Sequence, residues 1–291
     1  MRHRYVCPIR WADLDLLGHV NNVRYVDYLQ EARVDLLRAH RWPETAGSED
    51  ATAALADALI VGRHEVTYRA PLLFSERPVL IECWVTELRA GSFTMAYEVY
   101  HEDEAGGRTV YAEASTVLAP YRFDIESPRR LRPEERAVLE AYLEPVPRQR
   151  PGRVVIDRGR ATHYPVHVRF SDVDVYRHVN NVVYFEYFQE ARIRLFSELG
   201  RTLPGGDEAR VVVAQTDVDY LAPILLRGEP YDAWSQVAQV GRTSMVVESE
   251  IALGDQPLAR ARVVLVFFDP ASGRPTEPPA TYRESLVRAL G

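Results

Sequence analysis

Two hydrophobic patterns follow each other in the same order in both halves of this chain. Apolar and polar residues alternate over residues 5–11 and again over residues 164–170. A period of two predicts a strand at the start of each half. Apolar residues then recur three and four positions apart, which predicts helices over residues 22–39 and 181–199.

Several β-rich stretches follow each predicted helix. They cover residues 59–69, 79–88, 93–100 and 110–123, then 211–220, 231–240, 244–253 and 259–268. A strand, a long helix and four further strands without intervening helices indicate an α+β fold with an antiparallel sheet wrapping the helix. Residues 133–143 suggest a short helix that closes the first half.

The second half repeats the first at a constant offset. Residues 13–23, with Asp13, Asp15 and the run His-Val-Asn-Asn-Val, return as residues 172–182. A long period that occurs only twice indicates duplicated domains. We therefore expect a domain over residues 1–148, a proline-rich linker over 149–160 and a second domain over 161–291.

Composition and charge narrow the class of protein. The chain has 291 residues, of which 46% are hydrophobic, and a net charge of −7. An acidic balance argues against a nucleic-acid partner, because binding phosphates requires a basic face. No apolar run is long enough to span a membrane and no signal-peptide core is visible, so we expect a cytoplasmic protein without a membrane partner. Cys7 and Cys83 have no counterparts in the repeat and are interpreted as core residues.

The repeated loop carries the candidate chemistry. Asp15 and Asp174 are the second aspartates of two Asp-x-Asp pairs that stand just before the predicted helices. A carboxylate there lies beside backbone N–H groups that can hold a developing oxyanion. One aspartate suffices to stabilise a loop, so the presence of a second aspartate in each pair favours a functional role for that residue.

Other loop residues have both a structural and a functional interpretation. The histidines either build the turn or bond the carboxylate and orient a substrate carbonyl. The asparagines are candidates to cap the helices, and the tyrosines are candidates for core residues or walls of an acyl pocket. Gly18 permits unusual backbone angles, but Arg177 replaces it in the repeat. These supporting candidates are Gly18, His19, Asn21, Asn22, His178, Asn180 and Asn181, with Tyr25, Tyr28, Tyr184 and Tyr187 for the pocket.

The string Asp-x-Asp-x-x-Gly-His-Val-Asn-Asn-x-x-Tyr, followed by Glu-Ala-Arg, resembles the 4-hydroxybenzoyl-CoA thioesterase-like branch of the hotdog-fold superfamily. The resemblance implies two tandem hotdog domains that form a pseudo-dimer. It carries the catalytic carboxylate over to Asp15 and Asp174, as nucleophile or as base for water. It further implies an acyl-CoA substrate hydrolysed without metal or cofactor, and a homo-oligomer, expected as a dimer of double-hotdog chains.

Three alternatives stay open. Acyl-ACP thioesterases of plants carry an asparagine two residues after the aspartate, where this chain has Leu17 and Tyr176. A non-catalytic acyl-CoA or fatty-acyl binding protein would keep the pocket without the reaction. A metal site would need further ligands, and none stands at a recognisable spacing.

Overall fold

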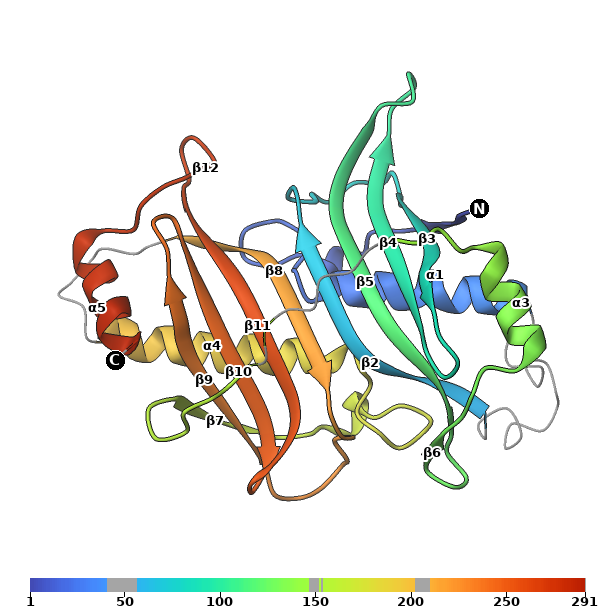
Figure 1. The fold of residues 1–291 in the computed structure, drawn as a ribbon. Coiled ribbons are helices and arrows are strands. Elements are labelled where there is room, and N and C mark those ends of the chain that lie inside the picture. The colour runs from blue at the N-terminus through green and yellow to red at the C-terminus, as the bar shows by residue number, and fades with distance from the viewer. Residues whose placement is uncertain (41–56, 147–151, 153, 202–209, 291) are drawn as a thin grey trace. The chain divides into compact units, whose positions relative to one another are not determined.

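The computed structural model describes residues 1–40, 57–146, 152, 154–201 and 210–290. The chain divides into two compact units, Met1–Arg150 and Pro151–Gly291 (Figure 1). Each unit contains one long helix and one antiparallel sheet, and each is described by itself.

The sheet of the first unit has the strand order β1-β3-β4-β5-β2, with every neighbouring pair antiparallel. A short 3-10 turn at Trp11–Asp13 separates β1 from the long helix α1. The elements are β1 His3–Cys7, α1 Arg24–Ala39, β2 Asp57–Tyr68, β3 Val79–Leu88, β4 Phe93–Glu102, β5 Arg108–Arg122, β6 Ser127–Pro128 and α3 Pro133–Ala141.

The second unit repeats this order as β7-β9-β10-β11-β8, again antiparallel throughout. A 3-10 turn at Phe170–Asp172 precedes its long helix α4. The elements are β7 Thr162–Val166, α4 Val183–Arg201, β8 Val211–Tyr220, β9 Tyr231–Val240, β10 Ser244–Leu253, β11 Gln256–Asp269, β12 Arg274–Pro275 and α5 Ala280–Leu290.

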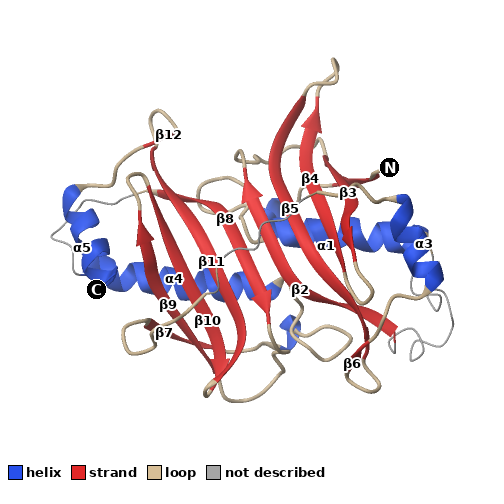
Figure 2. Ribbon diagram, in the orientation of Figure 1, coloured by secondary structure: helices blue, strands red, loops and turns tan. Residues whose placement is uncertain are grey.

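The long helix of each unit lies along one face of its sheet (Figure 2). Val26, Leu29 and Leu36 recur at helical spacing on α1 and are buried, which is the pattern of an apolar stripe. Burial alternates along β3, so one face of the sheet meets this stripe. The predicted α+β fold, a long helix wrapped by an antiparallel sheet in each half, is confirmed.

Both cysteines lie in the core of the first unit, as expected. Cys7 and Cys83 are buried, and burial raises the pKa of each thiol to about 12. At neutral pH the thiolate that a nucleophilic cysteine needs is therefore scarce.

The opening strand is shorter than the alternation predicts. β1 ends at Cys7, and Trp11 belongs to the 3-10 turn. Pro8 explains the early end, because proline lacks the N–H that a ladder requires. The helices α1 and α4 begin at Arg24 and Val183, two residues after the predicted start.

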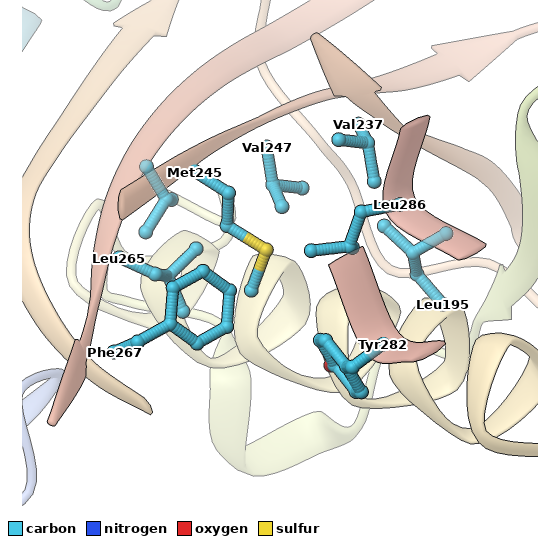
Figure 3. Close-up of a cluster of buried hydrophobic side chains, with 9 residues drawn as sticks. Leu195, Val237, Met245, Val247, Leu265, Phe267, Tyr282 and Leu286 are labelled. Carbon is cyan, nitrogen blue, oxygen red and sulfur yellow. The ribbon is translucent and has the colours of Figure 1, made fainter. Parts of the chain in front are cut away.

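The helix α5 was not predicted and completes the core of the second unit (Figure 3). Leu286 and Tyr282 of α5 pack with Leu195 of α4 and with Met245 and Phe267 of the sheet. The short helices occupy matching places, since α3 contacts β3 and α5 contacts β9. The C-terminal helix is thus the repeat of the helix that closes the first unit.

Candidate active site

Asp15 begins a tight turn in a small hairpin that leads into α1. Leu14 pairs with Val20, and the Asp15 amide donates to the His19 carbonyl at 2.8 Å. The Gly18 amide donates back to the Asp15 carbonyl at 3.0 Å, and Gly18 has a φ of +77°. Because glycine has no Cβ, it adopts this left-handed conformation without strain.

The second unit builds the same hairpin around Asp174. Val173 pairs with Val179, the Asp174 amide donates to the His178 carbonyl at 2.9 Å, and the Arg177 amide donates to the Asp174 carbonyl at 3.0 Å. Arg177 takes the position of Gly18 with a φ of +65°. The exchange of glycine for arginine therefore preserves the turn at the cost of a strained backbone.

Arg177→Gly is expected to stabilise the protein by about 1 kcal/mol, because it releases the left-handed strain of a residue with a Cβ. Gly18→Ala is the reciprocal change and is expected to cost a similar amount. No atom lies within 4 Å of a Cβ built at Gly18, so that loss would come from φ alone. Urea unfolding of both variants measures the effect; an unchanged midpoint for Arg177→Gly would contradict it.

Asp15 and Asp174 use only one carboxylate oxygen within their own turns. Asp15 Oδ1 accepts from the Leu17 amide at 2.8 Å and the His19 amide at 3.4 Å, and Asp174 Oδ1 accepts from the Tyr176 amide at 2.9 Å. In the described part of the chain, neither Oδ2 atom accepts a hydrogen bond. Both side chains are half-buried. Each turn thus orients a carboxylate and leaves one oxygen available.

Burial raises the pKa of the Asp174 carboxyl above its ordinary value, although amide hydrogen bonds from Tyr176 and His178 oppose the shift. The folded chain therefore holds a proton on Asp174 more tightly than the unfolded chain does. The contribution of this group favours folding at low pH and is lost as the pH rises through the folded pKa.

Asp174→Asn is consequently expected to raise the free energy of unfolding at pH 7, and the gain should shrink as the pH falls towards the carboxyl pKa. The asparagine oxygen can still accept from the Tyr176 amide, so the turn is retained. Thermal unfolding between pH 4 and pH 8 (chosen as roughly the span from one charge state to the other) measures the difference. Asp255→Asn is the control, since that side chain is fully exposed; a loss of stability at pH 7 in Asp174→Asn alone would refute the prediction.

The first aspartate of each pair has a different environment. Asp13 is 2% exposed and accepts from the Arg10 amide at 3.0 Å, from the Arg10 guanidinium at 2.8 Å and from the Tyr28 hydroxyl at 2.6 Å. Burial would raise the pKa of Asp13, but the hydrogen bonds from Arg10 and Tyr28 outweigh it and hold that pKa below its usual value. Asp13 is therefore a saturated structural anion.

Asp172 repeats this arrangement. It accepts from the Arg169 amide at 2.9 Å, from the Arg169 guanidinium at 2.9 Å and from the Tyr187 hydroxyl at 2.7 Å. Its pKa is also lowered, because the bonds from Tyr187 and Arg169 outweigh the effect of burial. Of each pair, the second aspartate alone keeps an oxygen without a partner in the described residues.

The asparagines lie between the hairpin and the helix. Asn21 Oδ1 accepts from the Val23 amide at 3.2 Å, and Asn180 Oδ1 accepts from the Val182 amide at 3.3 Å. The carbonyls of Asn22 and Asn181 accept from the hydroxyls of Tyr68 and Tyr220, at 2.8 and 2.7 Å. The N-cap residue of α1 is Val23, which makes no side-chain cap bond, so the predicted capping by Asn21 or Asn22 is wrong there and the bond of Asn21 lies in the turn before the helix.

The histidines join the hairpin to a neighbouring loop through their backbones. His19 pairs with Leu73, and His178 pairs with Leu225. Both side chains are half-buried. Their roles as orienting groups stay a prediction.

The four candidate tyrosines are buried and lie within the first five residues of α1 and α4. Tyr25 packs edge-on against Tyr68 with ring centroids 5.3 Å apart, and Tyr184 packs likewise against Tyr220 at 4.9 Å. Their rings are thus core residues whose hydroxyls reach the loops, and a role as pocket walls stays a prediction.

Arg10 and Arg169, which bind the first aspartate of each loop, were not identified from the sequence. Each stands three positions before the first aspartate of its loop, so the pair obeys the same repeat offset as the aspartates. This shared offset is the sequence pattern from which the two arginines could have been identified. Because the chain is rich in arginine, these two arginines do not stand out until the carboxylates that they contact are known.

Two further features concern ligands. No cluster of three or more histidine, cysteine or acidic side chains with metal-binding geometry occurs among the residues that the structure describes. A pocket of about 500 Å³ lies in the second unit, between residues 154–158 and the strands β10 and β11. Glu250, Arg158 and Arg260 line it, each arginine forms an ion pair with Glu250, and no candidate residue of the aspartate loops is among the lining residues.

None of the helices in the described ranges is both long and apolar enough to cross a membrane.

Comparisons with known proteins place these features in context. A family model described as the thioesterase-like superfamily matches residues 9–139 and again residues 168–289. The uncharacterized protein YsmA of Bacillus subtilis (strain 168) is 30% identical over 129 residues, which cover 42% of this chain and 82% of YsmA. Each match to the family model contains one complete aspartate hairpin and its helix.

Solved structures share the fold of nearly the whole chain. An enzyme provisionally named oleoyl thioesterase from Lactobacillus plantarum has a TM-score of 0.75 at 15% identity, covering 92% of this chain and 97% of its own. The 12:0-ACP thioesterase from Umbellularia californica has a TM-score of 0.72 at 14% identity, covering 92% and 94%. At such identities the likeness establishes the fold and no more.

Proposed function

This chain belongs to the thioesterase-like superfamily, and we propose that it is an acyl-CoA thioesterase that hydrolyses an acyl or aroyl thioester to the free acid and CoA. Asp15 and Asp174 are the proposed catalytic carboxylates. One observation carries the proposal: in each hotdog unit the second aspartate alone keeps a carboxylate oxygen without a hydrogen-bond partner in the described residues, in a hairpin that leads into the long helix.

The arrangement supports two versions of the reaction. As a base, the carboxylate takes a proton from water and the hydroxide adds to the carbonyl carbon; the carbon–sulfur bond then breaks, and the leaving sulfur takes the proton from the carboxylic acid and departs as the thiol. As a nucleophile, the carboxylate displaces the thiolate itself, and water then hydrolyses the mixed anhydride. Both versions require an anionic carboxylate and donors for the oxyanion.

The start of each helix supplies those donors. First-turn N–H groups have no intrahelical carbonyl to bond, and the helix dipole adds positive potential there. The amides of Tyr25 and Tyr184 stand at this point of α1 and α4. One such donor contributes about 3 kcal/mol to acyl transfer.

An acyl-ACP thioesterase is the second candidate. It is worth testing because the 12:0-ACP thioesterase has the same fold over 92% of this chain, although that likeness does not identify the carrier. The chain instead has Leu17 and Tyr176 two residues after its aspartates, which favours the CoA thioester. Both candidates place the same chemistry at the same carboxylates and differ in the carrier.

Release of free thiol from a panel of short, long and aromatic acyl-CoAs tests the proposal, with acyl-ACPs of matching chain length as a second panel. We expect hydrolysis of at least one CoA thioester with kcat/KM above that of the matching acyl-ACP. Preference for the ACP thioesters would select the second candidate. Tight binding of acyl-CoA with no thiol release from either panel would identify a binding protein and overturn the proposal.

A further inference from the structure

Two tyrosines near the start of each long helix contact the aspartate hairpin or the loop that pairs with it. In the first unit the Tyr28 hydroxyl donates to Asp13 Oδ2 at 2.6 Å. In the second unit the Tyr187 hydroxyl donates to Asp172 Oδ2 at 2.7 Å. Both bonds are buried, and in each case one helix residue reaches the base of the hairpin fifteen positions earlier.

The other tyrosine holds the loop that pairs with the far strand of the hairpin. Tyr184 Oη accepts from the Ile224 amide at 3.0 Å, and the Ile224 carbonyl accepts from the Val179 amide at 2.8 Å. In the first unit the Leu72 carbonyl likewise accepts from the Val20 amide at 2.8 Å, and Tyr25 lies close to the Leu72 amide.

These bonds bear directly on where the second aspartate sits. The Asn21 amide donates to the Asp13 carbonyl at 2.8 Å and so closes the base of the hairpin, two residues before Asp15. The Asn180 amide closes the other hairpin on the Asp172 carbonyl at 2.9 Å. A side chain that fixes this base to a buried helix therefore sets the position of the turn that carries the free carboxylate.

We propose that Tyr28 and Tyr187 are positioning residues for hydrolysis, acting through Asp13 and Asp172 to hold Asp15 and Asp174 against the starts of α1 and α4. The inference rests on the proposed function and assigns these tyrosines a task other than lining the acyl pocket. A displacement of about 1 Å at a reacting group lowers rates about 100-fold, so loss of a restraint at the hairpin base should be visible in turnover.

Tyr28→Phe, Tyr187→Phe and the double change test the proposal, because each removes a hydroxyl and keeps the ring in the core. Measured well below the melting temperature, the double change is expected to lower kcat at least about tenfold with KM altered less than about twofold, since the hairpin is displaced but the pocket is intact. The larger single effect should fall on the unit whose aspartate contributes more in Asp15→Asn and Asp174→Asn.

Val99→Ala is the matched control, because Val99 is 0% exposed in the core strand β4 and lies outside the loop. It should lower the melting temperature and leave kcat unchanged within about twofold at the assay temperature. If the tyrosine variants lose stability but keep the kcat of the unmodified chain, the hydroxyls are structural only and the inference fails, while the proposed hydrolysis stands.

A second measurement does not depend on activity. Hydrogen exchange of residues 11–22 should quicken at least about tenfold in Tyr28→Phe relative to the unmodified chain, and relative to Val99→Ala at equal stability. Unchanged exchange there would overturn the inference even if no thioester is hydrolysed.

Discussion

Replacing Asp15 and Asp174 together by asparagine is expected to lower kcat/KM for the best thioester by about 10²–10⁴-fold, whether the carboxylates act as bases or nucleophiles. Asparagine keeps the size of the side chain and an oxygen that can accept from the Leu17 and Tyr176 amides. The turns are thereby retained while the negative charge is lost. Free-thiol release measures the effect, and far-UV circular dichroism verifies the fold.

The single changes Asp15→Asn and Asp174→Asn show how much of the activity each unit contributes. A chain with one active site loses activity in only one of them, whereas two independent equal sites lose about half in each. Asp255→Asn is the control for charge alone, because its side chain is fully exposed on a hairpin of the second unit. Full activity in the double variant would remove both aspartates from the mechanism.

Leu286→Ala is expected to cost about 2–5 kcal/mol of unfolding free energy in the second unit. Leu286 is 0% exposed and packs with Phe267 and Met245 (Figure 3), so truncation leaves a cavity that rigid strands cannot fill. Its neighbour Val287 is 49% exposed, and Val287→Ala should change stability by about 0.5 kcal/mol or less. Denaturant unfolding compares the two; equal effects would mean that α5 adds nothing to the core.

Strand positions were predictable because their signal is local. Residues 211–220, 231–240 and 244–253 form strands at the predicted limits, since alternate side chains face the helix and turn residues interrupt the alternation. The apolar pattern of the helix α5 is a weaker indication of a helix. Its buried face consists of Tyr282, Ser285 and Leu286, and a buried serine breaks the apolar stripe on which such a prediction depends.

From the sequence, the candidate site could be predicted as a loop that occurs once in each half of the chain. The same offset joins Asp13 to Asp172 and Asp15 to Asp174, and both pairs precede a helix. The family resemblance selected the second aspartate of each pair as the candidate, but the residues themselves did not show how the two aspartates differ physically. Both are followed by similar residues, so local reasoning gives them similar environments.

The sequence by itself thus determined the duplication, the order of the main strands and of the two long helices, and the repeated loop that carries the candidate carboxylates, because each is encoded in residues near one another along the chain. Only the tertiary structure showed that both carboxylate oxygens of Asp13 accept hydrogen bonds from Arg10 or Tyr28, whereas Asp15 Oδ2 has no hydrogen-bond partner in the described residues. It also decided that Arg177 adopts the backbone conformation of Gly18. The physical reason is that burial and hydrogen bonding depend on which distant residues the fold brings to a carboxylate, and no local pattern contains that information.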